Sequence, residues 1–242
     1  MLLIAGGSRD PNLRRLADAA AHRGLPFRSA CLDAVPPLPV SWEQSRPDLW
    51  IGGEAFGPEG TSLFIRYDVF SPQSGSGQED GRAAWYDAIK GWALAHPQVG
   101  ILNRGNELRE VSKPRALVWA REAGFAVPET WITNELGRFS SRENAYVAKP
   151  VCGGRQTRPL EDLREGTAGP WLVQERLDYP ELRLFGVGGR HFAFEILSGM
   201  LDHRADQDAR LREVEPPEAL LRPMRLLMER LGGRLAWASV LF

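Results

Sequence analysis

Hydrophobic and polar positions at the start of the chain predict a strand followed by a helix. The apolar run 1–5 reads as the strand, and a glycine turn comes directly after it. Asp10 is a suitable N-cap, Pro11 suits the first helical turn, and Gly24 is expected to end the helix. The apolar positions in between follow helical spacing: Leu13, Leu16, Ala17 and Ala20. A strand, a turn and a helix in this order are typical of an α/β layer fold.

The pattern is less regular between this helix and residue 104. Residues 31–62 are rich in proline, glycine and tryptophan and show no clear period, whereas 62–70 is predicted to be a strand, an apolar run that Arg66 and Asp68 interrupt. The polar segment 71–81 is expected to form a loop. A helix is then predicted up to Pro97, because one of its faces is apolar at Trp85, Ile89, Trp92 and Ala95. Residues 99–103 form a further strand candidate.

After Ser112 the pattern predicts an antiparallel sheet with flanking helices. A helix is expected from Pro114 to its glycine stop at Gly124. Extended segments follow at 127–133, 145–151, 170–175, 182–187 and 191–197, the last two of which are joined by Gly188–Gly189, a hairpin turn signal.

The chain closes with a helix and a strand. Helical spacing of apolar residues runs over 217–231, but Pro223 lies inside it, so we expect a kink or a later start. The final run 235–242 is predicted to be a strand.

Composition excludes several classes of protein. The 242 residues carry a formal charge of −1, which argues against a nucleic-acid binder because phosphate neutralisation needs a basic excess. No apolar run approaches the roughly 18 residues of a membrane span. With only 2 cysteines, Cys31 and Cys152, a disulfide framework is not expected, and a reduced cytoplasmic protein is the default.

Lysine is rare in this chain and therefore informative. Of the 30 basic residues only Lys90, Lys113 and Lys149 are lysines. Codon bias explains the arginines on the surface, whereas lysine supplies a compact point charge that suits phosphate oxygens. Lys149 lies on a predicted strand that runs into the glycine loop CGGRQTR (152–158), where backbone N–H groups can approach phosphates closely. An ordinary surface turn is the alternative interpretation.

Two further segments suit the same ligand. The strand 170–175 ends in Gln174 and Glu175, whose backbone and amide can face an adenine edge. Glu181 can accept hydrogen bonds from ribose hydroxyls, and Arg183 and Arg204 can face phosphates or a reacting carboxylate. The alternatives are an ordinary hairpin with exposed charges and a solvated charged loop.

In their order and spacing these segments resemble the ATP-grasp superfamily. SKPRALVWAREAGFAVPETWIT is similar to the family segment in which a lysine opens a helix that leads to Gly-hydrophobic-x-Pro-x-Thr. VAKPVCGG resembles the nucleotide lysine with its glycine loop, LVQERL the adenine hinge, and ELRLFGVGGRHFAFEI the following hairpin with its arginine. ILSGMLDHR resembles a stretch of the branch that contains the ribosomal-protein glutamate ligase and the graspetide (ribosomal peptide) maturases.

The resemblance implies an α/β (α+β) fold in two parts. Residues 1–103 take the place of the pre-ATP-grasp α/β domain, and 104–242 that of an ATP-grasp-like nucleotide-binding domain with antiparallel sheets and flanking helices, incomplete at its C-terminus. It also implies roles for individual residues. Phosphate contacts fall to Lys113, Lys149, Gly153, Gly154 and Arg155, the adenine pocket to Gln174, Glu175 and Leu177, the ribose to Glu181, and the acyl-phosphate or acceptor side to the catalytic candidates Arg183 and Arg204.

The sequence departs from the family at its magnesium site. The resemblance implies ATP and Mg²⁺ as cofactors, and the family binds Mg²⁺ through an acidic residue and a later Glu-x-Asn motif. Here the chain reads LAWASVLF without either, and Mg²⁺ requires hard oxygen ligands. Glu195, Asp202 and Asp206 are other carboxylates, but none has the expected position. Either this is a shortened form of a longer ligase, or the metal site has been lost.

Three functions therefore stay open. The first is an ATP-dependent ligase that joins a carboxylate to an amine or a hydroxyl through an acyl phosphate, with a peptide or a small molecule as substrate. The second is a non-catalytic ATP-grasp-like protein that binds a nucleotide, a peptide or a partner enzyme. The third is a two-domain α/β binding module with accidental motif matches. A sheet edge left without its last family strand also predicts a homodimer.

Overall fold

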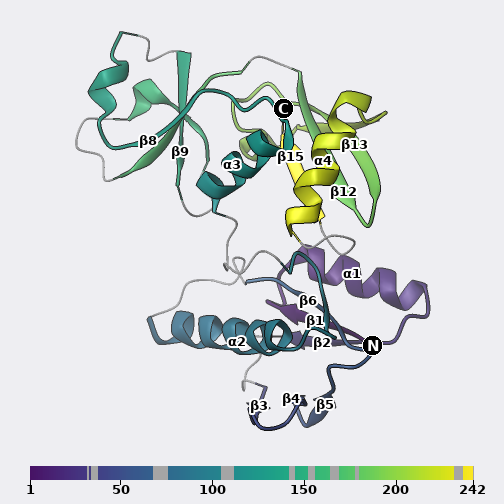
Figure 1. Cartoon of the computed structure of the whole chain (residues 1–242). Helices are drawn as coiled ribbons and strands as arrows, with labels where there is room; N and C mark the ends of the chain where they lie inside the picture. Colours follow the sequence, from purple (N-terminus) through teal and green to yellow (C-terminus); the bar gives the residue numbers. More distant parts are fainter. Residues whose placement is uncertain are drawn as a thin grey trace. The chain divides into compact units, whose positions relative to one another are not determined.

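The structure is a computed structural model that describes residues 1–31, 33, 38–67, 76–104, 112–141, 145–151, 156–163, 169–177, 180–231 and 237–241, without the side chains of 76–80 and 237–241. The chain divides into two compact units, Met1–Arg104 and Gly105–Phe242, both drawn in Figure 1. Each unit combines helices with β-sheets, so the expected mixture of α and β structure is confirmed. Within the described residues, no helix has the length and apolarity needed to cross a bilayer.

The first unit is built on a parallel sheet. Its strands lie in the order β2 (Phe27–Cys31), β1 (Leu2–Gly6), β6 (Ser62–Ile65) and β7 (Gly100–Ile101). Helix α1 (Pro11–His22) connects β1 to β2, and α2 (Ser76–Ala95) precedes β7. The two connections run in opposite directions along the sheet, so right-handed crossovers place the two helices on opposite faces (Figure 1).

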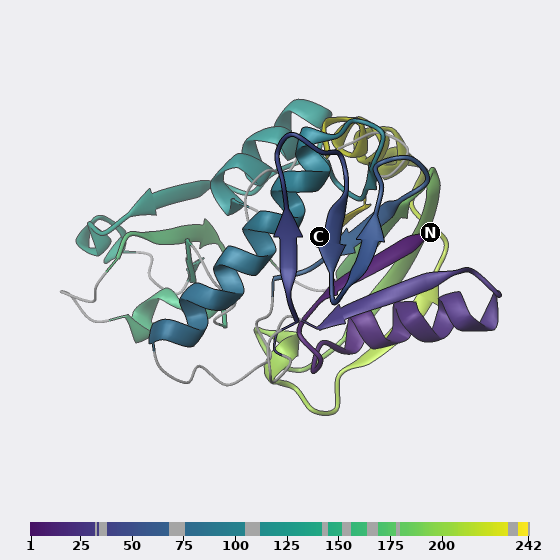
Figure 2. The same ribbon diagram turned by 90° about the horizontal axis from the view of Figure 1, so that it is seen from below.

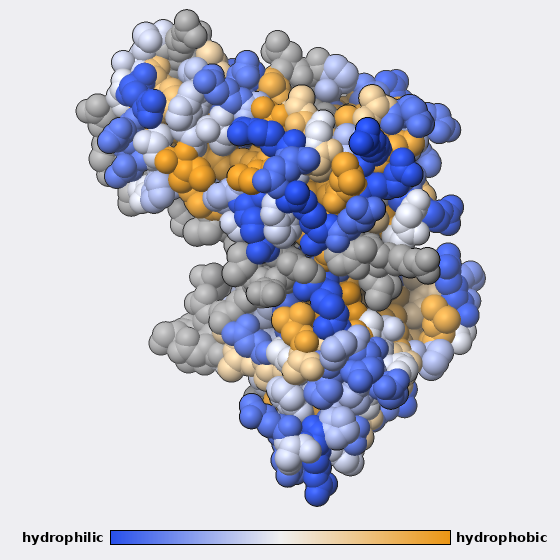
Figure 3. All heavy atoms as spheres, in the orientation of Figure 1, coloured by the Kyte–Doolittle hydropathy of each residue, from blue (hydrophilic) through white to orange (hydrophobic). Residues whose placement is uncertain are grey.

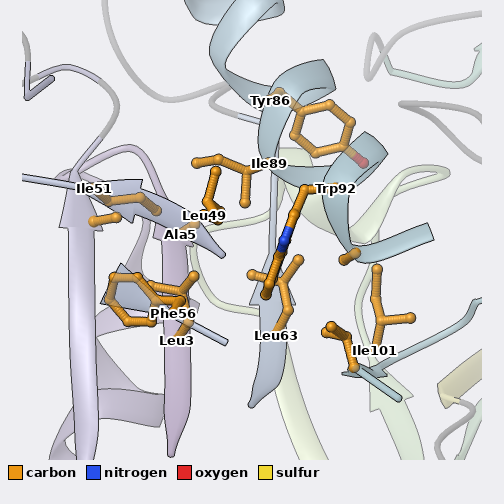
Figure 4. Close-up of a cluster of buried hydrophobic side chains, with 13 residues drawn as sticks. Leu3, Ala5, Leu49, Ile51, Phe56, Leu63, Tyr86, Ile89, Trp92 and Ile101 are labelled. Atoms are coloured by element: carbon orange, nitrogen blue, oxygen red, sulfur yellow. The ribbon is translucent and has the colours of Figure 1, made fainter. Parts of the chain in front are cut away.

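The core of this unit lies between α2 and one face of the sheet. Ile89 and Trp92 of α2 are fully buried against Leu3 and Leu63, as Figure 4 shows. Trp92 also donates its indole N–H to the backbone oxygen of Pro47 at 2.8 Å. A buried indole that has a hydrogen-bond partner combines a large apolar contact with a satisfied polar group, so the helical pattern at Ile89 and Trp92 is confirmed.

Two parts of the first unit differ from the sequence-based expectation. The irregular segment 31–62 holds a small antiparallel sheet of β3 (Val40–Trp42), β4 (Leu49–Ile51) and β5 (Glu54–Phe56), which Figure 2 shows side by side. Strands of three residues are too short to show a period, although Leu49, Ile51 and Phe56 are buried. The loop expected over 71–81 was wrong from Ser76 onward, where α2 begins. Acidic residues at 79 and 80 are favourable near a helix N-terminus, but because the segment is polar it was predicted to be a loop.

The second unit contains two four-stranded antiparallel sheets. We call the first one the lysine sheet, after Lys149: its order is β10 (Arg158–Pro159), β9 (Tyr146–Pro150), β11 (Trp171–Glu175) and β8 (Thr130–Thr133). One of its faces packs on an apolar cluster centred on Phe139 and Leu160. Phe139 contacts Tyr146 edge to face, with ring centroids 5.1 Å apart.

We call the other sheet the arginine sheet, after Arg183. Its order is β14 (Arg210–Val214), β13 (Arg190–Leu197), β12 (Glu181–Val187) and β15 (Trp237–Leu241). The predicted turn at Gly188–Gly189 joins β12 to β13, with both glycines at positive φ. One face packs against α3 (Lys113–Ala123) and α4 (Glu218–Leu231) around Leu184, Met224 and Met228.

Helix α4 continues through Pro223, so the expected later start was wrong. A proline inside a helix removes one hydrogen bond and costs roughly 3 kcal/mol. Here Pro223, Met224, Leu227, Met228 and Leu231 are all buried, and the packing of this face offsets that cost.

Polar side chains surround small groups of exposed apolar ones on the face drawn in Figure 3. Val118 on α3 and Ile132 on β8 are each about half exposed, and Leu226 on α4 is also exposed. Scattered exposed apolar residues of this kind are ordinary on protein surfaces.

Candidate functional site

Lys149 is held by a chain of hydrogen bonds to neutral partners, on the face of the lysine sheet opposite the Phe139 cluster. Gln174 lies opposite Val147 and Thr130, and this register places its side chain on the same face as that of Lys149. The Lys149 ammonium donates to Gln174 Oε1 at 2.8 Å, and Gln174 Nε2 donates to Thr130 Oγ1 at 2.9 Å. Thr130 in turn donates to the backbone oxygen of Pro128 at 2.7 Å. The ammonium is thereby oriented without a carboxylate among these partners.

Lys113, the first residue of α3, approaches the same strand. Its ammonium donates to the backbone oxygen of Pro150, the neighbour of Lys149, at 2.6 Å. Burial lowers the pKa of Lys149, the charge of Lys113 lowers it further, and Asp202 and Glu181 oppose this. Two ammonium groups that destabilise each other in a buried setting form a place where an anion would be stabilised.

Asp202 organises the edge of the site on the arginine-sheet side. Its carboxylate accepts from Arg204 Nε at 2.8 Å and Nη2 at 2.5 Å. It also accepts from the backbone N–H of Thr157, near the end of the glycine loop, at 2.8 Å. The hydrogen bonds from Arg204 hold the pKa of Asp202 well below its usual range. Asp202 thus fixes both the guanidinium of Arg204 and the end of that loop.

Glu181 and Arg183 project from the same face of β12, because they are two residues apart on one strand. His203, in the short turn after β13, contacts both of them. Its Nδ1 lies 3.1 Å from Glu181 Oε1, and its Nε2 lies 3.5 Å from Arg183 Nη2. Burial lowers the pKa of Arg183 and the carboxylate of Glu181 opposes this.

The structure brings four of the expected cations, Lys113, Lys149, Arg183 and Arg204, into one electrostatic neighbourhood. The charges of Lys113, Asp202, Glu181 and Arg204 all act on Lys149, and those of Glu181, Arg204 and Asp202 act on Arg183. Cations outnumber carboxylates in this group. An excess of positive charge in a partly buried setting favours a polyanionic ligand.

The residues expected to line the adenine pocket do not belong to this group of charged side chains. Glu175 and Leu177 are exposed, Leu177 by 54%, and the amide of Gln174 is engaged by Lys149 and Thr130 on both sides. Gly153, Gly154 and Arg155 lie outside the described residues. The sequence analysis gave no role to Thr130 or His203. Thr130 could have been found, because it is the threonine of the Gly-hydrophobic-x-Pro-x-Thr segment. His203 could not, because a single histidine between an aspartate and an arginine matches no motif.

The described carboxylates do not fit a magnesium site. No group of three or more His, Cys, Asp or Glu side chains there is close enough to hold a metal ion. The Asp202 carboxylate already accepts hydrogen bonds from Arg204 and from the backbone N–H of Thr157, and Glu195 forms an ion pair with Arg212. Asp206 accepts from the hydroxyl of Ser198 at 2.6 Å and from two backbone N–H groups. Oxygens committed to protein donors are poor ligands for a hard cation.

Comparisons with known proteins agree with this arrangement at the level of the fold. No family model matches the sequence, and no curated protein does. Among solved structures, the ATP-grasp ligase PsnB complexed with a minimal precursor superposes with a TM-score of 0.76 at 18% identity, over 99% of this chain and 84% of that one. The chain has the ATP-grasp fold.

More distant likenesses fit the same fold. Macrocyclase MdnC from Microcystis aeruginosa MRC, bound with precursor peptide MdnA, gives a TM-score of 0.69 at 19% identity over 99% of this chain and 86% of that one. The VanG D-Ala:D-Ser ligase from Enterococcus faecalis gives 0.59 at 14% identity, over 99% and 84%. The resemblance stated from the sequence is therefore confirmed for the ATP-grasp fold, with neighbours that include an ATP-grasp ligase complexed with a precursor peptide.

Proposed function

We propose that this chain is an ATP-dependent ligase that joins a carboxylate to an amine or a hydroxyl on a peptide substrate. The observation that carries the proposal is the electrostatic contact of Lys149 with Lys113 and Arg204, and of Arg183 with Arg204, within a chain of the ATP-grasp fold. Solved neighbours with the same fold are ligases complexed with precursor peptides or with ADP. The peptide class of the substrate follows from those neighbours.

In the proposed reaction a carboxylate is first activated. A carboxylate oxygen attacks the γ-phosphorus of ATP, the bond from that phosphorus to the β,γ-bridging oxygen breaks, and ADP leaves. The acceptor nitrogen or oxygen then attacks the acyl carbon, inorganic phosphate departs with the electrons of the acyl C–O bond, and the proton of the acceptor passes to the phosphate or to solvent. One ATP yields one ADP, one phosphate and one new amide or ester.

The side chains divide this work. Lys149 and Lys113 neutralise the phosphates together with the loop of Gly153, Gly154 and Arg155. The strand end at Gln174, Glu175 and Leu177 lines the adenine pocket, and Glu181 accepts from the ribose. Arg183 and Arg204 orient the acyl phosphate and the acceptor, and Asp202 keeps Arg204 in place. Catalysis of this kind consists mostly of positioning and charge stabilisation.

Calorimetric titration with ATP tests the nucleotide site. Wild-type protein is expected to bind ATP in the micromolar range. Lys149→Met, which keeps the length of the side chain and removes the charge, should weaken binding by about tenfold or more, the value of a charge-assisted hydrogen bond.

Arg158→Met is the matched control for this titration. Arg158 is exposed on the same sheet and lies opposite Ala148, which places it on the other face from Lys149. Equal affinity of wild type and Lys149→Met, or no binding at all by the wild type, would contradict the proposed nucleotide site.

The engaged state of the carboxylates favours a second candidate function, a non-catalytic ATP-grasp-like protein that binds a nucleotide, a peptide or a partner enzyme. Here Asp202, Glu195 and Asp206 are all held by protein donors. Titration in EDTA and in Mg²⁺ separates the two candidates. Binding that Mg²⁺ strengthens, followed by ADP release when a peptide is added, supports the ligase. Metal-independent binding without ADP release supports the second candidate.

A further inference from the structure

His203 lies between two oppositely charged side chains of β12. The short turn η4 (His203–Ala205) carries it to Glu181, 3.1 Å from Nδ1, and to Arg183, 3.5 Å from Nε2. Both His203 and Glu181 are largely buried, with side-chain exposures of 16% and 17%. A histidine held on both ring nitrogens in a partly buried place has a defined orientation.

The two partners specify the tautomer of His203. A guanidinium can only donate hydrogen bonds and a carboxylate can only accept them. The ring must therefore carry its proton on Nδ1, directed to Glu181, and present a lone pair on Nε2 to Arg183. A second proton on Nε2 would replace this acceptor by a donor that faces the Arg183 cation.

Arg183 depends on this contact for its orientation. Its Nε atom is buried and has no hydrogen-bond partner among the described residues. The contact of Nη2 with His203 therefore fixes the plane of the guanidinium on one side, and the buried Nε edge is left for an anion.

The charged neighbours of His203 come from β12 and from its own turn. Glu181 and Arg183 lie on β12, and Asp202 and Arg204 flank His203 in the sequence. Lys149 on β9 feels the charges of Glu181, Asp202 and Arg204. Asp202 is committed to Arg204 and to Thr157. Glu181 is thus the carboxylate that the geometry assigns to His203.

We propose that His203 is a positioning residue which, as the neutral Nδ1–H tautomer, couples the carboxylate of Glu181 to the guanidinium of Arg183. This inference deepens the proposed function and rests on the roles given there to Glu181 and Arg183. It means that the ribose end and the acyl-phosphate end of the site are set together by one imidazole ring.

Nitrogen-15 NMR of the imidazole rings tests the tautomer without any nucleotide. In the full chain at pH 8 two of the 4 histidines are expected to show a protonated Nδ1 and an unprotonated Nε2: His203, and His96, whose Nδ1 lies 2.8 Å from the backbone oxygen of Trp92. The pattern that vanishes in His203→Asn belongs to His203, and that of His96 should remain. Free imidazole rings in water favour the opposite tautomer, so the expected signature is distinctive. A His203 ring with its proton on Nε2, or one that averages between both forms, would overturn the proposal.

Nucleotide selectivity tests the coupling. Affinities for ATP, 2′-deoxy-ATP and 3′-deoxy-ATP are measured by calorimetry for wild type, Glu181→Gln, His203→Phe and the double variant. Glu181→Gln should lower the preference for ATP about fivefold to tenfold, and His203→Phe should lower it equally. The double variant should lose no more than either single one, because residues that act as a unit are not additive.

His203→Asn is the matched conservative variant. Its amide can still donate to Glu181 at the place of Nδ1 but cannot reach Arg183, so the preference for ATP should stay within about twofold of wild type, whereas a ligase assay should show a lower kcat. Retained selectivity in His203→Phe together with lost selectivity in Glu181→Gln would refute the coupling. If the wild type binds no ATP, the proposed function fails, and the NMR measurement still decides for or against the link from Glu181 to Arg183.

Discussion

The two sheets of the second unit hold their cations in different ways. On the lysine sheet, the ammonium of Lys149 is oriented by the neutral amide of Gln174, and that of Lys113 by a backbone carbonyl. On the arginine-sheet side, Arg204 is bound by the carboxylate of Asp202, and Arg183 meets His203. The amide of Gln174 orients the Lys149 ammonium without forming an ion pair with it, whereas the carboxylate of Asp202 fixes the guanidinium of Arg204 in place. The comparison teaches that Arg204 is held in a set position by its carboxylate, whereas Lys149 has a neutral partner, which suits the phosphate role in the proposed function.

Replacing Asp202 is expected to have the largest effect on stability. Asp202→Ala removes the partner of Arg204 and leaves the Thr157 N–H without its acceptor. Loss of one member of a largely buried, hydrogen-bonded charge pair should lower the free energy of unfolding by about 2–3 kcal/mol, the value being reduced because Arg204 is partly exposed. Urea unfolding followed by fluorescence measures it.

Asp208→Ala, at an exposed position in the same loop, is the control for Asp202→Ala. Equal stability of the Asp202 and Asp208 variants would show that Arg204 is not held by its carboxylate, and the contrast between the two sheets would disappear.

The packed face of the arginine sheet gives the next largest effect. A Cβ atom added at Gly186 would lie 2.3 Å from Met228 Sδ on α4, so Gly186→Ala should force the helix and the sheet apart and cost about 1–3 kcal/mol. Gly199→Ala is the control, because nothing lies within 4 Å of its Cβ position. Thermal unfolding that shows no difference between these two variants would mean that α4 does not pack closely on β12.

Acid should weaken the arginine side selectively. The pKa of Asp202 lies below its ordinary value in the folded protein, so its contribution to stability is fully present above the unfolded carboxyl pKa of about 4 and is lost as the pH falls below it. Unfolding free energies from pH 7 down to pH 3 should therefore fall less steeply in Asp202→Asn than in wild type. Parallel pH profiles of the two proteins would contradict this origin of the acid sensitivity.

The smallest expected effect on stability is that of replacing Lys149, which contrasts the lysine sheet with the Asp202–Arg204 pair. Because burial and the charge of Lys113 already disfavour the Lys149 ammonium, Lys149→Met should leave stability unchanged or raise it by up to about 1 kcal/mol, although it weakens ATP binding. The same urea unfolding measurement decides it. A loss of stability as large as that of Asp202→Ala would show that Lys149 is a structural residue.

Sequence reasoning succeeded where local rules act. The strands around Lys149 and Gln174, the hairpin at Gly188–Gly189 and the helix stop at Gly124 each follow from residues next to one another, and the structure has them all. Helix propensity and turn chemistry are short-range properties, so one sequence contains them.

Contacts between distant residues could not be read in this way. His203 meets Glu181 across 22 positions of sequence, and Thr157 meets Asp202 across 45. Whether Gln174 faces a lysine or a ligand depends on the register of β9 and β11, which is set by packing of the whole sheet. The three-residue strands β3, β4 and β5 were missed for the same reason, because pairing and burial stabilise them and their own composition does not.

The bond from Thr157 to Asp202 has a consequence for which substitutions the chain can accept. Its donor is a main-chain N–H, which every amino acid except proline supplies at position 157, whereas its acceptor is one particular side chain. A saturation library selected for folding should therefore recover almost any residue at 157 and reject proline there, while 202 stays confined to aspartate. Selection on side chains therefore acts on the acceptor Asp202 and not on the donor at 157. Substitutions at 157 other than proline would leave the Asp202 carboxylate, which binds Arg204, in place.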